Sequence, residues 1–548
     1  MRLVTLIPFL ALPVLALAGD GKYSPCPLLR GYFSPPTINR TSSTFTNFST
    51  IYTAEFDNLI ATGSHPVYGP ITSNTTSFSI ILSTGAADND DPVFFEYHYT
   101  APGAEAPEPV SSDTVFPAGS LTQVLTVYAW LATLGDDAMT MPITHFLPEL
   151  LGSNLSAGSD FPIFWDDITI GALAGQTSGL NRDSGACTLG AACNWGDFLN
   201  VVKSQSPLFL PDTTPINSNI AFQLLAFALE HEVKNASYAQ ILQRNVFGPS
   251  NMTRSGLLGD VELPTFGGKV DGKADGEPGA LSFLTTTTDL GRWGAQLLAG
   301  TSLPPALLRR WLQPASDTSN RANAVGRPWE IFHKPVESGA GTLVIDAFTK
   351  NGMGIQHYAS YFGLTPDLGV AFAILAHDTE GDTPDLNVHA DILAEAIGDL
   401  ADVAARQMAG GSDRAVLNVT DGLGIVVEEL VVDGADVLAD IAGKMGLAKA
   451  EDLDMRLYPT NMLATKGKGQ QVRQFLAVYQ DKTALVDAVY QDKTALVDAG
   501  TPTCITWQGV GELGNRAVER VMFEVGDDRI ATRMWVDTVP GTVLSKEA

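Results

Sequence analysis

The stretch Asp113–Trp130 reads DTVFPAGSLTQVLTVYAW. Gly119 and Ser120 directly precede an apolar segment, Leu121–Leu134, whose hydrophobic residues recur at helical spacing. Gln123 lies three residues after Ser120, so a helix here places both side chains on one face near its N-terminus. A serine at that position is favoured as a helix cap, and the helix dipole also favours negative charge developing on its oxygen. The stretch therefore predicts a buried helix and makes Ser120 either a cap or a candidate nucleophile.

Two further polar motifs adjoin predicted elements. Pro215–Leu225 reads PINSNIAFQLL and leads into a second apolar helix, Ile220–Glu232. Phe348–Gly354 reads FTKNGMG, and its glycines indicate a close approach of the backbone to a neighbouring segment. Strand-like runs follow at Ser360–Phe362 and Gly369–Phe372, and then an Ala-rich helix at Val388–Met408.

The order of these motifs resembles the serine β-lactamase and penicillin-binding-protein family, in which S-x-x-K opens a buried helix. The segment Trp165–Leu180, the Phe247-Gly-Pro249 and Thr288-Asp-Leu290 stretches and the run from Ser360 to Val370 also occur at family-like places. The resemblance covers about residues 26–400. It implies a β-lactamase/transpeptidase-like fold, with an antiparallel sheet flanked by helices and an all-helical subdomain.

The resemblance implies a catalytic set of Ser120 as nucleophile, Asn219 to orient substrate and Lys350 to stabilise charge or lower the serine pKa. The Ser120 N–H and an N–H of the strand edge would form an oxyanion hole. The residues expected to line the substrate site are Gln123, Asn217, Asn351, Gly352 and His357. Lys350 as a solvated surface lysine and His357 as a structural histidine are the simpler alternatives.

The chain departs from the family pattern at its bases. Gln123 stands where the family has lysine, Asn217 where it has tyrosine, and Asn351 where it has Thr or Ser. Neither Gln123 nor Asn217 can accept a proton as a general base. The resemblance therefore supports a serine hydrolase or acyltransferase acting on an ester, thioester or amide, by analogy within fungal specialised metabolism. A pseudoenzyme that only binds ligands, or a non-hydrolytic cyclase, is the alternative that the missing bases favour.

A second domain is expected after the first. Residues 26–405 form the β-lactamase-like domain, 406–415 a linker around Gly410-Gly411-Ser412-Asp413, and 416–548 a smaller β-rich domain with alternating runs at Leu423–Val432 and Ala517–Val525. The second domain is similar to a companion domain of fungal secreted members. Within it, VYQDKTALVDA at 478–488 is repeated at once at 489–499, which indicates a recent tandem duplication or a sequence error.

The N-terminus predicts export. Residues 1–18 combine Arg2, a short apolar run and an Ala-Leu-Ala ending, the three parts of a signal peptide. An uncleaved anchor or a buried strand is the alternative, although the run is shorter than the roughly 20 residues of a membrane span. Seven N-x-S/T sequons agree with a secretory lumen or secretion: Asn39, Asn47, Asn74, Asn154, Asn235, Asn251 and Asn418.

Composition limits the partners. The chain of 548 residues carries a formal net charge of −28, which argues against nucleic acid and anionic membranes. We expect a small acyl-type substrate, no membrane attachment after signal cleavage, and no cofactor or metal. The oligomeric state stays open.

The cysteine count suggests two disulfides in an oxidising compartment. Cys187 and Cys193 share a Gly/Ala-rich loop, where a local bridge is expected, which would leave Cys26 to pair with Cys504. Three pairings are nevertheless possible from sequence alone.

Overall fold

The computed structural model describes residues 35–36, 38–85, 91–104, 108–151, 161–263, 265–268, 270, 276–338, 341–353, 355–380, 383–408, 415–418, 424–432, 435–444, 447–466, 470–482, 512–513, 516–517, 520–525, 531–536 and 544–545. They fall into two compact units. The larger unit spans Phe33–Ser338 and Thr342–Gln407, and the smaller one contains Met408–Ala548.

The larger unit is built on an eight-stranded antiparallel sheet with the order β4-β3-β13-β12-β11-β10-β9-β8. The central strands are buried along almost their whole length because both faces of the sheet are covered. The strands are β3 Thr76–Thr84, β4 Val93–Tyr99, β8 Ser316–Asp317, β9 Asn323–Val325, β10 Glu330–Ser338, β11 Gly341–Gly352, β12 Tyr358–Thr365 and β13 Val370–Asp378.

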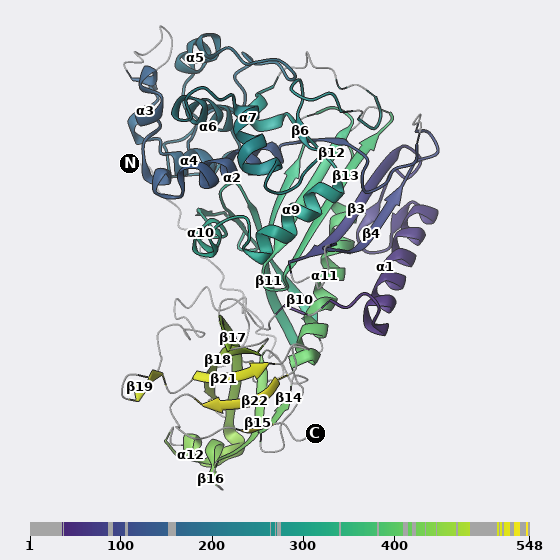
Figure 1. Ribbon diagram of the computed structural model, residues 1–548, viewed down its shortest axis with the longest axis vertical. Helices are drawn as coiled ribbons and strands as arrows, with labels where there is room; N and C mark the ends of the chain where they lie inside the picture. The colour runs from purple at the N-terminus through teal and green to yellow at the C-terminus, as the bar shows by residue number, and fades with distance from the viewer. Residues whose placement is uncertain are drawn as a thin grey trace, which may run out of the picture. The chain divides into compact units, whose positions relative to one another are not determined.

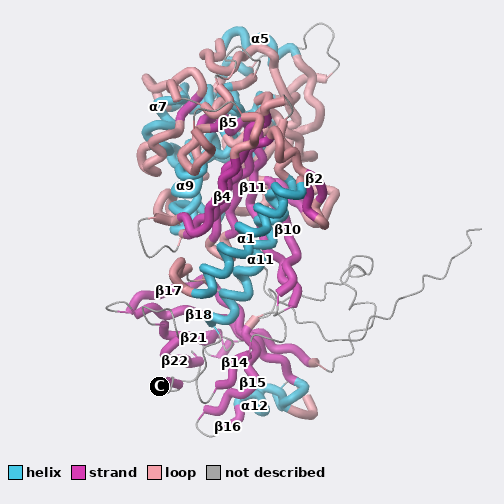
Figure 2. The backbone as a smooth tube through the Cα atoms, turned by 90° about the vertical axis from the view of Figure 1, so that its right-hand side faces the viewer, coloured by secondary structure: helices cyan, strands magenta, loops and turns pink. Residues whose placement is uncertain are grey.

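Helices cover the two faces of this sheet. The helices α1 (Ser43–Thr62) and α11 (Asn387–Met408) lie side by side over one face (Figure 2). The Tyr52 hydroxyl of α1 donates to Asp399 of α11 over 2.7 Å. Helix α9 (Thr287–Ala299) packs on β3 and β13 from the opposite face (Figure 1). This is the layered architecture that the resemblance implies.

A helical part adjoins the α9 face. Its two longest apolar helices, α2 (Thr122–Leu134) and α6 (Asn219–Glu232), are buried along most of their length because they are apolar on nearly all sides. The Trp130 Nε1–H donates to the carbonyl of Leu225 over 3.0 Å and joins the two helices. The smaller helices are α3 Ile143–Phe146, α4 Ile170–Ala174, α5 Trp195–Ser204, α7 Tyr238–Leu242, α8 Pro278–Leu281 and α10 Pro305–Trp311.

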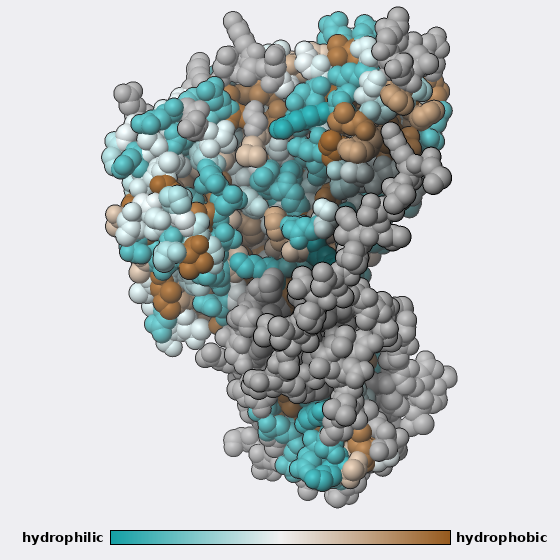
Figure 3. Space-filling model, turned by 180° about the vertical axis from the view of Figure 1, so that it is seen from behind, coloured by the Kyte–Doolittle hydropathy of each residue, from teal (hydrophilic) through white to brown (hydrophobic). Residues whose placement is uncertain are grey.

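Short strands complete the larger unit. A three-stranded sheet with the order β5-β7-β6 leads directly into α2. Its strands are β5 Phe116–Gly119, β6 Gly256–Leu257 and β7 Phe283–Thr285, and a separate pair is β1 Ser64–His65 with β2 Gly69–Pro70. Seen from behind, hydrophilic residues predominate on the surface, with scattered hydrophobic ones between them (Figure 3).

The smaller unit is rich in strands. Its main antiparallel sheet has the order β14-β15-β17-β18-β21-β22-β23, with β16 paired to β15. The elements are β14 Ala415–Asn418, β15 Ile425–Val432, β16 Ala435–Asp436, α12 Val437–Lys444, β17 Leu453–Lys466, β18 Gln470–Asp481, β19 Glu512–Leu513, β20 Arg516–Ala517, β21 Arg520–Val525, β22 Ala531–Val536 and β23 Leu544–Ser545.

Several details refine the sequence-based boundaries. The helix α11 continues to Met408, so the first residues of the predicted linker 406–415 are helical. The first four residues of the tandem repeat, Val478–Asp481, belong to β18, whereas 483–499 lie outside the described residues. The predicted signal peptide, residues 1–18, also lies outside them. Within the described part of the chain, no helix is long and apolar enough to cross a membrane.

Candidate functional site

Ser120 lies in the turn between β5 and α2, and its side chain is almost fully buried. The residue before it, Gly119, has a φ of +50°, a conformation that side-chain-bearing residues rarely adopt. Thr122 closes the turn, since its hydroxyl donates to the Gly119 carbonyl over 2.6 Å. Ser120 does not cap α2, because the helix has no side-chain cap. The simpler interpretation of Ser120 as an N-cap is therefore wrong.

Two glycines bring this turn against the end of β11. A Cβ on Gly119 would lie 2.5 Å from the carbonyl oxygen of Met353, and a Cβ on Gly352 would lie 2.1 Å from the carbonyl oxygen of Ala118. The Ser360 hydroxyl on β12 donates to that same Ala118 carbonyl over 2.9 Å. The K-N-G motif is thus held beside Ser120 through backbone contacts that only glycine permits.

The polar groups of Ser120 face Met353. Its hydroxyl donates to the Met353 carbonyl over 3.2 Å, and its N–H donates to the same oxygen over 3.3 Å. The sequence-based expectation that the Ser120 N–H is available to an oxyanion is therefore wrong for this conformation. The carbonyl of Met353 already occupies the position to which both donors point.

The amide side chains of the first two motifs form one hydrogen-bonded cluster. The Gln123 Nε2 donates to Asn219 Oδ1 over 3.1 Å and to Asn217 Oδ1 over 3.4 Å. The Asn219 Nδ2 in turn donates to the Asp183 carboxylate over 2.6 Å. Gln123 is fully buried, and its Oε1 has no hydrogen-bond partner among the described residues. The structure therefore joins Gln123, Asn217 and Asn219 into one network that ends on Asp183.

Ser218, the remaining hydroxyl of the N-S-N motif, has a local structural role. Its Oγ accepts the N–H of Ala221 as the N-cap of α6 and donates to the Asn181 carbonyl over 2.6 Å. Both interactions fix the start of α6 and with it the orientation of Asn219. The α6 cap and the buried face of α2 explain why residues about a hundred positions apart meet here.

Lys350 is buried within the sheet, with 1% of its surface exposed. Its Nζ forms an ion pair with Glu330 Oε1 over 2.5 Å, and the Asn351 N–H donates to Glu330 Oε2 over 3.0 Å. The interpretation of Lys350 as a solvated surface residue is therefore wrong. Among the described residues, no hydrogen bond joins Lys350 or Asn351 to Ser120.

His357, directly before β12, is hydrogen-bonded to the end of β13. It has a φ of +71°, and its Nδ1 donates to the carbonyl of Asp378 over 3.1 Å. Its ring lies 5.9 Å from that of His377, whose pKa burial lowers to about 4. In the described part of the chain, the hydrogen bonds of His357 and of Ser120 share no partner.

Sequence reasoning missed three groups of the site. Asp183 and Glu330 belong to no sequence motif, although the carboxylate of each forms a hydrogen bond with a motif residue. Met353 acts through its main-chain oxygen, which no side-chain pattern can indicate.

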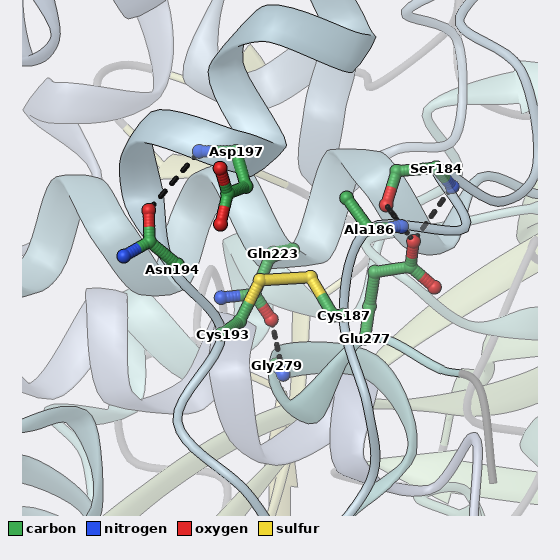
Figure 4. The surroundings of a disulfide bond; sticks show 9 residues. All are labelled: Ser184, Ala186, Cys187, Cys193, Asn194, Asp197, Gln223, Glu277 and Gly279. Carbon is green, nitrogen blue, oxygen red and sulfur yellow. Dashed lines mark hydrogen bonds between the residues drawn. A yellow bond between two sulfur atoms is a disulfide. The ribbon is translucent and has the colours of Figure 1, made fainter.

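The loop that carries Asp183 is anchored, since the Ser184 N–H and hydroxyl both donate to Glu277 Oε1 over 2.7 Å (Figure 4). Burial raises the pKa of the Glu277 carboxyl.

The predicted Cys187–Cys193 bridge is present, with a Cα–Cα distance of 4.8 Å (Figure 4). Cys26 and Cys504 lie outside the described residues.

Of the seven sequon asparagines, five are exposed: Asn39, Asn47, Asn74, Asn235 and Asn251. Asn418 is half-buried and its side-chain amide donates to Glu428, whereas Asn154 lies outside the described residues. Where the structure is described, no group of three or more His, Cys, Asp or Glu side chains is placed to hold a metal ion.

Comparison with known proteins gives matches over most of the chain. Residues 82–396 match the model of the family described as "Beta-lactamase", and residues 406–537 match "Beta-lactamase-like-like, C-terminal domain". A "Beta-lactamase-like protein" of Arthroderma benhamiae is 25% identical over 459 residues, covering 72% of this chain and 75% of its own length. A "Putative beta-lactamase-like 1" of Homo sapiens is 29% identical over 231 residues, covering 39% of this chain and 44% of its own length.

One solved structure, a beta-lactamase/D-alanine carboxypeptidase from Yersinia pestis, shares 18% identity with a TM-score of 0.49, over 66% of this chain and 100% of its own. The family model covers more than half of the sequence and includes Ser120, the amide network and the K-N-G strand. The chain therefore belongs to the beta-lactamase family.

Proposed function

We propose that this protein is a secreted, glycosylated binding member of the beta-lactamase family, which holds a small acyl-type ligand at Ser120 without transferring its acyl group. The observation that carries the proposal is the set of partners around Ser120. The Ser120 hydroxyl donates to the main-chain carbonyl of Met353. Gln123, three residues further on, is an amide held in a hydrogen-bonded network. A nucleophilic serine needs an adjacent base to accept its proton.

The buried amide network supports the same conclusion. The hydrogen bonds of Gln123 and Asn219 orient these side chains toward each other and toward Asp183 rather than toward Ser120. Hydrogen bonds hold these amide groups in place, and the Gln123 Oε1, unpaired among the described residues, offers an acceptor to a polar ligand. A site without a proton acceptor loses several orders of magnitude in rate but keeps its capacity to bind.

A second candidate, the serine hydrolase or acyltransferase, is favoured by one observation. Lys350 remains a buried cation on the strand that ends beside Ser120, and it is paired with Glu330. Release of Lys350 from Glu330 on ligand binding would supply a charge near the serine. Such an enzyme would act on an ester, thioester or amide, by analogy in fungal specialised metabolism. A non-hydrolytic cyclase that uses the same cleft is the third possibility.

Turnover and binding assays separate the three. Purified full-length protein and Ser120→Ala are assayed with a panel of p-nitrophenyl esters, thioesters and a chromogenic β-lactam. If the protein only binds its ligand, turnover by both proteins should equal the rate without protein. The corresponding uncleavable amides or ketones should raise the melting temperature of both proteins. Turnover that is lost in Ser120→Ala would establish the hydrolase instead. A new cyclised product formed equally well by both proteins would establish the cyclase.

A further inference from the structure

A cavity of about 210 Å³ lies in the helical part of the larger unit, and it shares no residue with the network around Ser120. We propose that this cavity is a binding site for a small organic cation, a primary ammonium group carrying a short apolar chain. Its walls come from the face of α6, the disulfide loop, the start of α7, the turn after β6 and α8. Its lining includes Phe227, Glu230, Leu257, Leu258, Asp260 and Ser282.

Two carboxyl groups face this cavity. Glu230 comes from the last turns of α6, and Asp260 comes from the turn after β6. Among the described residues, neither forms an ion pair with a basic side chain; the Glu230 Oε1 accepts only the N–H of Tyr238, over 2.7 Å. Burial raises the pKa of both carboxyls, and the charge of Asp260 raises that of Glu230 further. A cation between them would offset both the desolvation and the repulsion.

A buried hydroxyl without a partner independently points to a ligand. Ser282 lines the same cavity, is 1% exposed, and its Oγ has no hydrogen-bond partner among the described residues. Buried polar atoms are normally paired, so each exception requires an explanation. An ammonium group has three N–H donors and no acceptor. Glu230, Asp260 and Ser282 offer it one acceptor each from three different elements.

The remaining walls suit a short hydrocarbon chain. Phe227, Leu257 and Leu258 contribute apolar surface, and the Tyr238 hydroxyl is already engaged by Thr126 over 2.6 Å, which leaves its ring to the cavity. The Cys187–Cys193 bridge fixes one wall, because Cys193 lines the cavity beside Gln223 (Figure 4). The Gln223 Oε1 accepts the Gly279 N–H over 2.8 Å and joins α6 to α8, which both contribute to the lining. The site is therefore formed before a ligand arrives.

Isothermal titration calorimetry of the full-length protein tests the proposal, with n-butylammonium chloride as the probe and n-butanol as its uncharged counterpart. We expect saturable binding of n-butylammonium and none of n-butanol. The double variant Glu230→Gln/Asp260→Asn should weaken the affinity at least tenfold, and Ser282→Ala should weaken it by a smaller factor. Glu232→Gln, on the same helix but outside the cavity, should leave it unchanged, as should Ser120→Ala.

Three outcomes would overturn the proposal. They are equal binding of n-butanol, an unchanged affinity in the double variant, and tighter binding of calcium chloride alone that the double variant abolishes. The last result would assign the cavity to an inorganic ion. If circular dichroism shows that the double variant is unfolded, the single variant Asp260→Asn, at the exposed rim, replaces it in the test. This single substitution should by itself weaken the binding of n-butylammonium.

Discussion

The main-chain carbonyl of Met353 accepts two hydrogen bonds from Ser120, one from its hydroxyl over 3.2 Å and one from its N–H over 3.3 Å. A ligand carbonyl that approaches the Ser120 N–H must first displace this oxygen. Met353 directly follows the K-N-G motif at the end of β11 and is itself about half exposed, so the displacement involves the residue after one strand and not the core. The two residues therefore define both the closed state of the site and the change that would open it.

Restoring the family's bases should restore reactivity. In the double variant Gln123→Lys/Asn217→Tyr, a lysine stands three residues after Ser120. A tyrosine replaces Asn217, whose side-chain oxygen now accepts a hydrogen bond from Gln123. Because a base beside the serine accepts its proton, we expect covalent labelling by a fluorophosphonate probe, measured by intact mass, at least tenfold faster than in the natural protein. The triple variant with Ser120→Ala is the control and should stay unlabelled. A folded double variant that stays unlabelled, like the natural protein, would show that the missing bases are not the reason why Ser120 is unreactive.

Gly119 should be irreplaceable for steric reasons. Gly119→Ala places a Cβ 2.5 Å from the Met353 oxygen at a φ of +50°, and we expect the free energy of unfolding to fall by about 3 kcal/mol or more. Gly63→Ala is the matched control, since it has a φ of +70° but no atom closer than 4.0 Å. It should cost only about 1 kcal/mol, the strain of the left-handed conformation. Urea denaturation measures both, and equal losses would refute the close approach of the turn to β11.

The Lys350–Glu330 pair should respond asymmetrically to mutation. Glu330→Gln leaves the fully buried Lys350 ammonium without its carboxylate, and removing one partner of a buried pair costs about 3–5 kcal/mol of stability. Lys350→Met leaves only Glu330, whose side chain is 29% exposed and can be hydrated, so the loss should be clearly smaller. Chemical denaturation of both variants checks the order. The reverse order would mean that Glu330, and not Lys350, is the buried charge.

His389 should make the protein less stable in acid. It is buried on α11 against Phe78, neither ring nitrogen has a partner among the described residues, and burial lowers its pKa to about 4. An unfolded histidine has a pKa of about 6.5. As the pH falls from about 6.5 to 4, the unfolded chain therefore binds a proton that the folded one does not, and stability falls.

His389→Leu should remove this contribution. We expect a melting temperature that falls less between pH 7 and pH 5 than in the natural protein, and a gain of about 1 kcal/mol at pH 7, since unpaired polar atoms are replaced by an apolar group. His377, whose pKa is also lowered to about 4, remains and keeps part of the pH dependence. An unchanged pH profile would show that His389 is protonated, or hydrogen-bonded, in the folded protein.

The sequence predicted the elements well where one physical signal dominates. The apolar runs Leu121–Leu134 and Ile220–Glu232 are buried on nearly all sides, so their hydrophobicity alone identified α2 and α6. The predicted helix Val388–Met408 matches α11 to within one residue. The glycines of the K-N-G motif indicated a close backbone approach, and the contact of Gly352 with Ala118 is that approach.

The contacts that decide the chemistry could not be predicted. Met353 accepts from Ser120 through a carbonyl that every residue possesses, and Glu330 reaches Lys350 only because neighbouring strands place them side by side. Asp183 joins the network from a loop whose path depends on the Ser184–Glu277 contact. The motif positions were predictable because residue types at fixed spacing mark them, whereas their partners depend on tertiary packing.

The most direct test of the account is the intact mass of the natural protein after incubation with a fluorophosphonate probe, followed by peptide mapping. With Ser120 donating to Met353 and an amide at position 123, we predict no mass increase under conditions that fully label an active serine hydrolase. A stoichiometric adduct mapped to Ser120, and absent from Ser120→Ala, would contradict the account and establish an activated nucleophile.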